Sequence, residues 1–331
     1  MENYTIRYAT KEDIPNIKRF IDENWKKNHI LTRKEDFFEW QYTSDKLDYV
    51  LGIDADGNIQ GMLGFISYDD NDDRDIATSM WKANAGTSFL GIKLLMYVMD
   101  KEPHRTLFSP GINVKTTRDI YERMQFKMGR MNQWYRLRKV ESYVIAKIVD
   151  ARIPKYILAC ETVAVRYFAF EDLKEDFDFE KHVSKQSVPY KSLSYLKRRY
   201  FEHPIYEYLI YGIKQDGSET NAVIVLRIQE CNGAKALRFV DCIGNTEVLG
   251  NITHILDELL DEFNTEYIDM YEKGVDSNIL QKAGWIKLDE TDNIIPNYFS
   301  PYEQINVDIN YCTSDENIVL FRGDGDQDRP N

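Results

Sequence analysis

The spacing of hydrophobic and polar positions divides the first half of the chain into a regular series of strands and helices. Alternation over residues 4–8 predicts a strand, and apolar residues at positions 14, 17, 20 and 21 predict one face of a helix. The same analysis predicts a helix over 34–42, strands over 49–54, 61–68 and 76–83, a helix over 91–99, a strand over 106–109, a helix over 115–123 and a closing strand over 133–137. This mixture of elements indicates an α/β (α+β) domain.

The second half repeats this series. Strands are predicted over 207–214, 222–229, 236–242 and 267–271, and helices over 252–263 and 278–283, whereas residues 294–321 are less regular. Arg7-Tyr8 with Glu12-Asp13 returns 159 positions later as Arg166-Tyr167 with Glu171-Asp172. Three further matches, at an offset of 159 or 160, pair Gly52 with Gly212, Thr87 with Thr246 and Tyr121 with Leu280. Four matches in one order predict a duplication, with domains over 1–140 and 159–331 and a linker or packing segment over 141–158.

Composition and charge narrow the classes of function. The 331 residues are 43% hydrophobic, which is enough for two cores, and 42 basic against 55 acidic residues give a net charge of −13. That charge disfavours a nucleic-acid partner. The sequence shows neither a signal peptide nor an apolar run long enough for membrane insertion, so we expect a cytoplasmic protein. The cysteines at 160, 231, 242 and 312 lack metal or redox spacing, so neither a metal nor a disulfide is expected.

The end of the last helix in the first half carries a recognisable signature. Tyr121-Glu122-Arg123-Met124-Gln125-Phe126, the Leu90-Gly91 step and the element order together resemble the GNAT superfamily of acyl-CoA-dependent N-acyltransferases. The family has Gly where this chain has Gln125. The resemblance spans both halves and implies two tandem GNAT-like domains, each a central mixed, mostly antiparallel sheet flanked by helices. It also implies acetyl-CoA or another acyl-CoA as co-substrate.

The resemblance implies that backbone amides at the start of the central helix bind the pyrophosphate of CoA. The family's loop begins with Arg or Gln and ends with Gly or Ala, at positions where this chain has Ser88 and Lys93, whereas Gly91 is kept. The alternative is a plain helix start whose Gly91 only eases packing. The implied cofactor-binding residues are Trp81, Lys82, Ala83, Ser88, Phe89, Leu90, Gly91, Ile92, Lys93 and Asn113.

The two halves differ at the positions that matter for catalysis. By resemblance, Tyr121 is the general acid that protonates the departing CoA thiolate, whereas Leu280 in the second half cannot donate a proton. Glu247 and Asp241 replace Ser88 and Lys82 and would repel a pyrophosphate. We therefore expect the first half to be catalytic and the second to be degenerate. The alternative for Tyr121 is a tyrosine that only packs in the core.

No pattern defines the group that accepts the amine's proton. His29 lies between the first two predicted helices, in a segment that the resemblance assigns to the acceptor pocket, and Glu35 follows it. Both are candidate catalytic residues, and Trp40 and Gln41 are candidate acceptor-binding residues. A histidine in a loop can equally be a helix cap or a solvated side chain, and the nearby aromatic residues can be core.

The acidic C-terminal segment permits two interpretations. Asp324, Asp326 and Asp328 alternate, but the segment lacks the Gly and Glu positions of a calcium loop. It is either a disordered terminus or a segment that folds back to bring Asp324, Asp326 and Arg329 to the acceptor.

The whole chain resembles tandem GNAT-like proteins associated with bacterial surface-polysaccharide synthesis. This resemblance implies acyl transfer to a small-molecule amine, specifically a nucleotide-linked amino sugar. Two alternatives remain: a catalytically inactive tandem GNAT that binds a ligand or acts as a scaffold, and a Fem-type aminoacyl transferase. The net charge and the absence of heptads disfavour the second of these.

Overall fold

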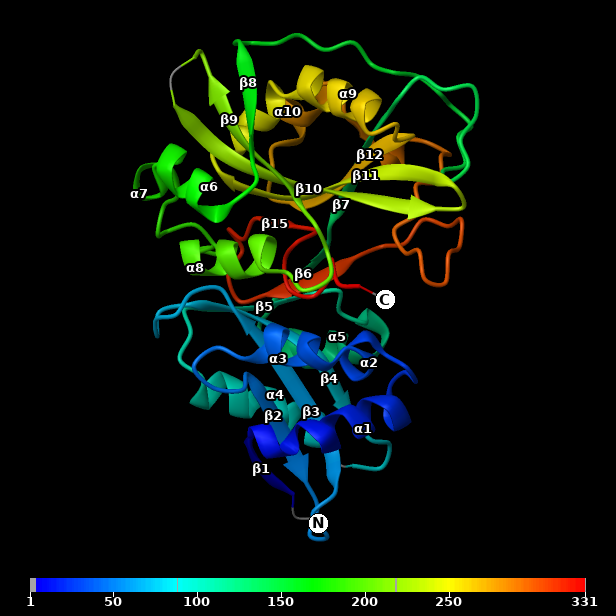
Figure 1. Cartoon of the computed structure of the whole chain (residues 1–331). Helices are drawn as coiled ribbons and strands as arrows, with labels where there is room; N and C mark the ends of the chain where they lie inside the picture. Colours follow the sequence, from blue (N-terminus) through cyan, green and yellow to red (C-terminus); the bar gives the residue numbers. More distant parts are fainter. Residues whose placement is uncertain (1–3, 88, 218, 331) are drawn as a thin grey trace.

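The computed structural model describes residues 4–87, 89–217 and 219–330. Its strands form two sheets, one in each half of an elongated molecule, and helices cover the sheets (Figure 1). The N-terminal strand lies at the far end of the first half. The C-terminal segment lies in the middle of the molecule, between the halves.

The elements follow the predicted order closely. The first half contains β1 (Thr5–Tyr8), α1 (Ile14–Asn24), α2 (Ile30–Arg33), α3 (Glu35–Tyr42), β2 (Tyr49–Ile53), β3 (Ile59–Ser67), β4 (Asp75–Ala83), α4 (Leu90–Lys101), β5 (Thr106–Pro110), α5 (Val114–Arg123), β6 (Lys127–Arg130) and β7 (Asn132–Leu137). The second half contains β8 (Thr162–Tyr167), α6 (Phe170–Asp176), α7 (Phe179–His182), α8 (Leu193–Leu196) with a π-helical turn (Lys197–Phe201), β9 (Leu209–Gln215), β10 (Thr220–Cys231), β11 (Ala234–Gly244), α9 (Thr253–Glu262), β12 (Tyr267–Lys273), α10 (Ser277–Lys282), β13 (Ile286–Lys287), β14 (Asn310–Thr313) and β15 (Leu320–Phe321).

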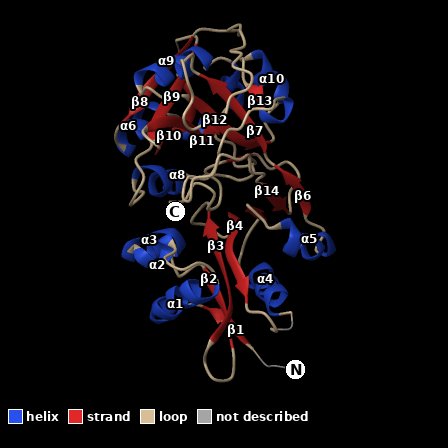
Figure 2. Cartoon of the chain, turned by 90° about the vertical axis from the view of Figure 1, so that its right-hand side faces the viewer, coloured by secondary structure: helices blue, strands red, loops and turns tan. Residues whose placement is uncertain are grey.

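Helices cover both faces of the first sheet. Figure 2 shows α1, α2 and α3 on one side of β2 and β3, and α4 and α5 on the other. The predicted apolar face of α1 is buried against the first side, through Ile14, Ile17, Phe20 and Ile21. Tyr121 of α5 and the buried residues of α4 belong to a separate core cluster on the second side.

The two sheets exchange strands. The first sheet has the order β1-β2-β3-β4-β5-β14-β6, so β14 from the end of the chain lies between two strands of the first half. The second sheet has the order β13-β7-β12-β11-β10-β9-β8, so β7 from the first half lies between two strands of the second. The closing strand predicted over 133–137 therefore forms, but it closes the other sheet, because Trp134 packs in the core of the second half. The predicted boundary at residue 140 follows this exchanged strand and stays a prediction.

Both sheets are mostly antiparallel, which confirms the predicted fold class. The parallel pairs are β4 with β5 and β11 with β12, and each pair is three residues long. In β4 the ladder with β3 is interrupted at Met80, which has φ 52°. In β11 the ladder with β10 is interrupted at Val240, 160 positions later. The two irregularities thus lie at the offset of the predicted repeat.

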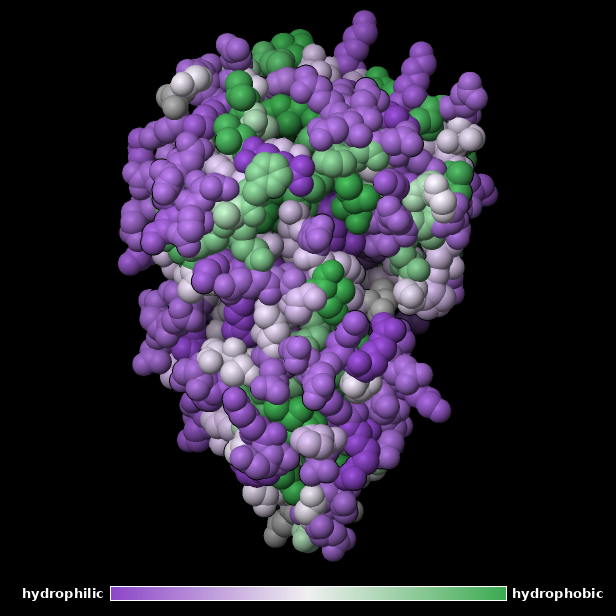
Figure 3. Space-filling model, in the orientation of Figure 1, coloured by the Kyte–Doolittle hydropathy of each residue, from purple (hydrophilic) through white to green (hydrophobic). Residues whose placement is uncertain are grey.

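The surface is mostly hydrophilic on the face shown in Figure 3, in keeping with the excess of acidic residues. Among the described helices, none combines the length and the apolar character needed to cross a bilayer.

Candidate active site

Strand β4 diverges from its neighbour β5 after a short parallel contact. The two strands pair only at Asp75–Ala77 of β4, so residues 78–83 continue without pairing to β5. The Thr78 carbonyl accepts a hydrogen bond from Ser109 Oγ of β5 at 3.1 Å. We call residues 78–83 the divergent segment. Its backbone groups on the β5 side are the ones that can hydrogen-bond an extended ligand.

Tyr121 of α5 lies beside the divergent segment. It is 1% exposed, and its ring makes an edge contact with Trp81 at 5.7 Å between centroids. The side chains of Thr78, Ser109 and Cys312, from β4, β5 and β14, lie next to its hydroxyl. Burial, and then Cys312, raise the pKa of Tyr121 well above 10. The hydroxyl therefore keeps its proton at neutral pH.

The start of α4 lies at the end of the divergent segment. Trp81 Nε1 donates to the Gly91 carbonyl at 3.0 Å. A Cβ built on Gly91 would lie 3.4 Å from Trp81 Nε1 and 3.8 Å from Ala83 Cβ, so a small side chain would fit there. Trp81, Ala83 and Gly91 are therefore brought together.

The other predicted cofactor-binding residues are more dispersed. Leu90 is buried, whereas Phe89, with φ 59°, and Lys93 are exposed. Lys82 and Ile92 are half-buried, and Asn113 is exposed and caps α5 by accepting from the Lys115 amide at 3.1 Å. Ser88 lies outside the described residues.

The corresponding region of the second half is filled by the chain itself. Strand β15 pairs with β12 at Glu272 and Lys273, and the Gly323 amide donates to the Val240 carbonyl at 2.7 Å. Leu280 is buried in the core. Asp241 is buried as well and pairs with Lys191 at 2.6 Å. The C-terminal strand thus occupies the place where the second half would otherwise hold a ligand beside β11.

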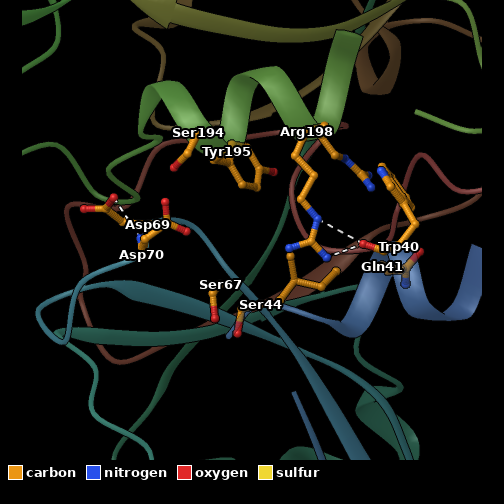
Figure 4. A pocket seen from close by; sticks show the side chains of 11 residues that line it. Trp40, Gln41, Ser44, Ser67, Asp69, Asp70, Ser194, Tyr195 and Arg198 are labelled. Atoms are coloured by element: carbon orange, nitrogen blue, oxygen red, sulfur yellow. Dashed lines mark hydrogen bonds between the residues drawn. The ribbon is translucent and has the colours of Figure 1, made fainter. Parts of the chain in front are cut away.

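A cavity of about 110 Å³ lies between the halves (Figure 4). The end of α3 and the end of β3 form its first-half wall, and α8 with the following turn forms its second-half wall. Its lining residues are Trp40, Gln41, Ser44, Ile66, Ser67, Asp69, Asp70, Ser194, Tyr195, Arg198 and Arg199. We call it the inter-half cavity. Trp40 and Gln41, both predicted to bind the acceptor, lie in its wall.

Several polar atoms around this cavity lack hydrogen-bond partners within the described chain. They are Trp40 Nε1, Gln41 Oε1, Tyr195 Oη and Arg199 Nε. Gln41 and Arg199 are each 4% exposed. Gln41 Nε2 donates to Tyr42 Oη at 3.0 Å, and Tyr42 Oη lies 2.7 Å from Ser79 Oγ. Hydrogen bonds thus connect the cavity wall with the divergent segment, next to the interruption at Met80.

Asp48 lies directly behind the cavity wall. Its carboxylate accepts hydrogen bonds from Ser44 Oγ at 2.8 Å and from Ser67 Oγ at 3.3 Å, and both serines line the cavity. Asp48 is 1% exposed, and burial raises its pKa to about 7 against the opposing effect of Ser44. The sequence analysis missed this residue. A signal existed, because Asp48 is an ionisable residue within the apolar run Leu47-Asp48-Tyr49-Val50-Leu51.

His29 and Glu35 are placed differently from each other. His29 is buried and caps α2, its Nδ1 accepting from the Leu31 amide at 3.3 Å. Burial, and then Arg329, lower its pKa to about 3, so it is neutral at pH 7 with its acceptor nitrogen engaged. Glu35 is the exposed first residue of α3. The predicted catalytic roles of both residues stay predictions, and that of His29 requires loss of the capping bond.

The C-terminal segment is folded between the halves, so it is not a disordered terminus; its contact with the acceptor stays a prediction. Asp324 is fully buried and accepts from Tyr68 Oη at 3.1 Å and from Lys191 Nζ at 3.2 Å. Asp326 pairs with Arg329 at 2.6 Å, and Arg329 lies 3.5 Å from Met80 Sδ. These two residues line a second cavity of about 70 Å³ together with Arg227, Arg238 and Arg322. Four of the five predicted acceptor-binding residues are thus divided between two cavities, whereas Asp324 is buried and lines neither.

Comparisons with known proteins decide the fold. No family model and no curated protein matches the sequence. Solved structures do match, among them a putative acetyltransferase from Pyrococcus horikoshii, which is 10% identical with a TM-score of 0.53 over 96% of this chain and 92% of that one. The fold is a GNAT fold.

Two further structures support this assignment. A GCN5-related N-acetyltransferase from Anabaena variabilis is 7% identical, with a TM-score of 0.57 over 94% of this chain and 72% of that one. A glucosamine N-acetyltransferase region of a fungal multi-domain β-N-acetylglucosaminidase is 9% identical, with a TM-score of 0.50 over 94% of this chain and 38% of that one. At such identities the likeness concerns the GNAT fold and leaves the reaction to be argued from the site.

Proposed function

We propose that the protein is an N-acyltransferase that moves an acetyl or other acyl group from acyl-CoA to a small-molecule amine, and that the first half carries the reaction. One observation carries this proposal. The hydroxyl of Tyr121 lies beside the divergent segment of β4, whereas the second half has Leu280 and fills the equivalent place with β15. Among the described residues, only the first half combines a strand edge that no other strand pairs with and a nearby proton donor.

The residues around this edge suit an acyl-CoA. Backbone amides of Trp81 and Ala83, which alternate with the β3-facing amide of Lys82, would bind the pantetheine and polarise the thioester carbonyl. At the start of α4, the amides of Gly91 and Ile92 would be offered to the pyrophosphate, because those of Leu90 and Lys93 already donate to the Thr87 and Phe89 carbonyls at 3.4 and 3.0 Å. As the amine forms its bond to the carbonyl carbon and the C–S bond breaks, Tyr121 would protonate the thiolate.

We propose an amino sugar, carried on a nucleotide, as the acceptor, and surface-polysaccharide synthesis in the cytoplasm as the setting. The fungal structure whose description names glucosamine N-acetylation supports the choice of an amino sugar, since it shares the fold. The second half would then serve to shape the acceptor side. It supplies Tyr195 and Arg199 to the inter-half cavity, and Arg227 and Arg238 to the second cavity.

Calorimetric titration with acetyl-CoA tests the proposal. We expect saturable binding that Gly91→Glu abolishes, because the new carboxylate would lie among the amides meant for phosphate. Met96→Glu is the matched control, since Met96 is 54% exposed on the same helix and the variant gains the same charge. Binding that survives Gly91→Glu would place the ligand elsewhere. No binding at millimolar acetyl-CoA would favour the alternative of an inactive, ligand-binding or scaffolding GNAT.

A further inference from the structure

We propose that the inter-half cavity binds a protonated primary amine that also carries hydroxyl groups, and that Asp48 takes the amine's proton through Ser44 and Ser67. The inference rests on the proposed function and specifies the acceptor site and the base for that reaction.

The unsatisfied polar atoms of the cavity define the kind of ligand. Trp40 Nε1 and Arg199 Nε need acceptors, Gln41 Oε1 needs a donor, and Tyr195 Oη can bond either kind of group. A buried polar group without a partner is destabilising, so a ligand that satisfies these atoms gains affinity from each. Hydroxyl groups both donate and accept. A polyhydroxylated molecule therefore fits these atoms, whereas a purely apolar one would leave them unsatisfied.

The charges around the cavity orient an ammonium group. Asp69 and Asp70 lie on one side of the cavity, and Arg198 lies on the other, where it donates from Nε to the Trp40 carbonyl at 3.0 Å (Figure 4). An ammonium is attracted to the carboxylates and repelled by the guanidinium. Ser44 and Ser67 lie between these two sides, so the ammonium end of the ligand is placed within reach of the serines.

The serines connect the cavity to a buried carboxylate. Each hydroxyl donates to Asp48 and retains lone pairs that can accept a hydrogen bond from the ligand. The ammonium passes one proton to a serine oxygen while that serine passes its own proton to Asp48. The products are a neutral amine, an unchanged serine and a protonated Asp48, so the transfer is balanced. Asp48, whose pKa burial raises to about 7, can then return the proton to water.

The position of the cavity agrees with the attack that follows. Ile66 and Ser67 of β3 pair with Ala77 and Ile76 of β4, immediately before the divergent segment. Ser67 alternates with Ile66, so its side chain is directed to the face of Leu63 and Phe65, whose core cluster includes Tyr121. The amine at Ser67 and the hydroxyl of Tyr121 would thus act on the same face of the first sheet. The proton that the nitrogen releases on bond formation balances the one that the thiolate receives.

The surroundings of Asp48 set the pH dependence. Its charged neighbours are Glu102, which raises its pKa, and Arg74 and Arg198, which lower it. Lys46 pairs with Glu102 at 2.7 Å, and exposed Asp45 accepts from the same Ser44 hydroxyl at 3.0 Å. Because the base must be deprotonated, we expect kcat/KM to rise with pH up to about 7 and then to level.

Binding is tested first, without acyl-CoA. In ¹H–¹⁵N spectra of the full chain, Trp40→Phe assigns one indole signal among the five tryptophans. D-glucosamine should shift this signal saturably, whereas D-glucose and cyclohexylamine should each bind at least about tenfold more weakly, a step of 1.4 kcal/mol. Equal binding of cyclohexylamine, or no shift with any of the three, would overturn the assignment of the cavity.

Catalysis is tested with acetyl-CoA and D-glucosamine by following thiol release. Asp48→Asn should lower kcat/KM by about 10²- to 10⁴-fold and remove the rise of the rate with pH, with acetyl-CoA binding retained. Asp292→Asn, at an exposed position of the second half, is the matched control and should leave both unchanged. Ser67→Ala keeps Asp48 and tests the relay if the Asp48 variant does not fold. Full turnover in Asp48→Asn would overturn the role of Asp48. If the wild-type protein does not bind acetyl-CoA, that result would instead refute the proposed function.

Discussion

Asp328 and Arg227 form a doubly hydrogen-bonded ion pair that fixes the C-terminal segment to strand β10. Arg227 Nη2 and Nε lie 2.7 and 3.1 Å from the two carboxylate oxygens, and Tyr208 Oη donates to the same carboxylate at 3.0 Å. Both partners are buried, at 3% and 6% exposure. Burial alone would raise the pKa of Asp328, but Arg227 holds it below its usual range.

Removing this carboxylate should destabilise the protein strongly. Asp328→Ala leaves the buried Arg227 without its partner, which typically costs about 3–5 kcal/mol of the free energy of unfolding. Urea denaturation at pH 7 measures this loss in the free energy of unfolding. Asp100→Ala, which breaks the exposed pair with Lys101, is the control and should cost less than about 1 kcal/mol. Equal effects of the two variants would show that the pair does not hold the segment. Because the folded pKa of Asp328 is depressed, its contribution should be complete above about pH 4 and be lost on acidification.

Tyr121→Phe should lower turnover by about 10²- to 10⁴-fold and leave acetyl-CoA affinity unchanged, since only the proton donor is removed. Steady-state kinetics and calorimetry on the same preparation measure the two quantities. Tyr97→Phe on α4 is the control. It also removes a tyrosine hydroxyl, but the ring of Tyr97 contacts Tyr8 instead of Trp81, so this variant should retain activity. Undiminished turnover in Tyr121→Phe would remove this residue from the mechanism and leave it a packing tyrosine.

The stability of the protein should also report the ionisation of Asp48. Its pKa is raised from 3.8 to about 7, so the folded state binds the proton more tightly than the unfolded state. The contribution of Asp48 to stability therefore falls as the pH rises from about 4 to 7, by up to about 4 kcal/mol at about 1.4 kcal/mol per pKa unit. Asp48→Asn should lose less stability than the wild type between pH 5 and pH 8 in urea titrations. Asp45→Asn should follow the wild type. Parallel curves for all three proteins would contradict a raised pKa.

His29 should remain neutral through the physiological range. Burial, and then the charge of Arg329, lower its pKa to about 3, so its ring signals should not titrate between pH 5 and 8 in NMR spectra. Arg329→Ala should move the midpoint upward, and Lys26→Ala should do so by less, because Lys26 has the smaller effect. A wild-type midpoint near 6.5 would show that His29 is solvated and available as a base.

The order of the elements could be predicted because each helix or strand has its own spacing of apolar residues along the sequence. The apolar positions of α1 and the alternation in β3 and β4 are visible without any partner. Pairing is not local, however, and β7 shows the limit: its alternation predicts a strand but cannot say which sheet receives it. Strand β14 was missed for the same reason, since it is short and joins strands about 200 residues earlier in the chain.

The residues of the candidate site were likewise only partly predictable from the sequence. Resemblance to a family indicated Tyr121, Gly91, Trp40 and Gln41, whereas residues contributed by the other half were not foreseen. Tyr195 and Arg199 face the cavity only because α8 packs on the end of β3, an arrangement that no spacing in the sequence records. Asp48 is different. Its position between Leu47 and Tyr49 was visible in the sequence. Its proposed role as a base depends on the hydrogen bond from Ser67, which the hydrophobic pattern does not predict.

Because β7 and β14 are exchanged, the sheet of each half contains a strand that the other half supplies. Excising the second half would remove the strand that joins β5 to β6, and excising the first would remove the strand that joins β13 to β12. The second half, which has Leu280 at the position matched to Tyr121, therefore cannot be deleted without disrupting the first sheet. The second half is needed to complete the first sheet, whether or not it also helps to bind a ligand.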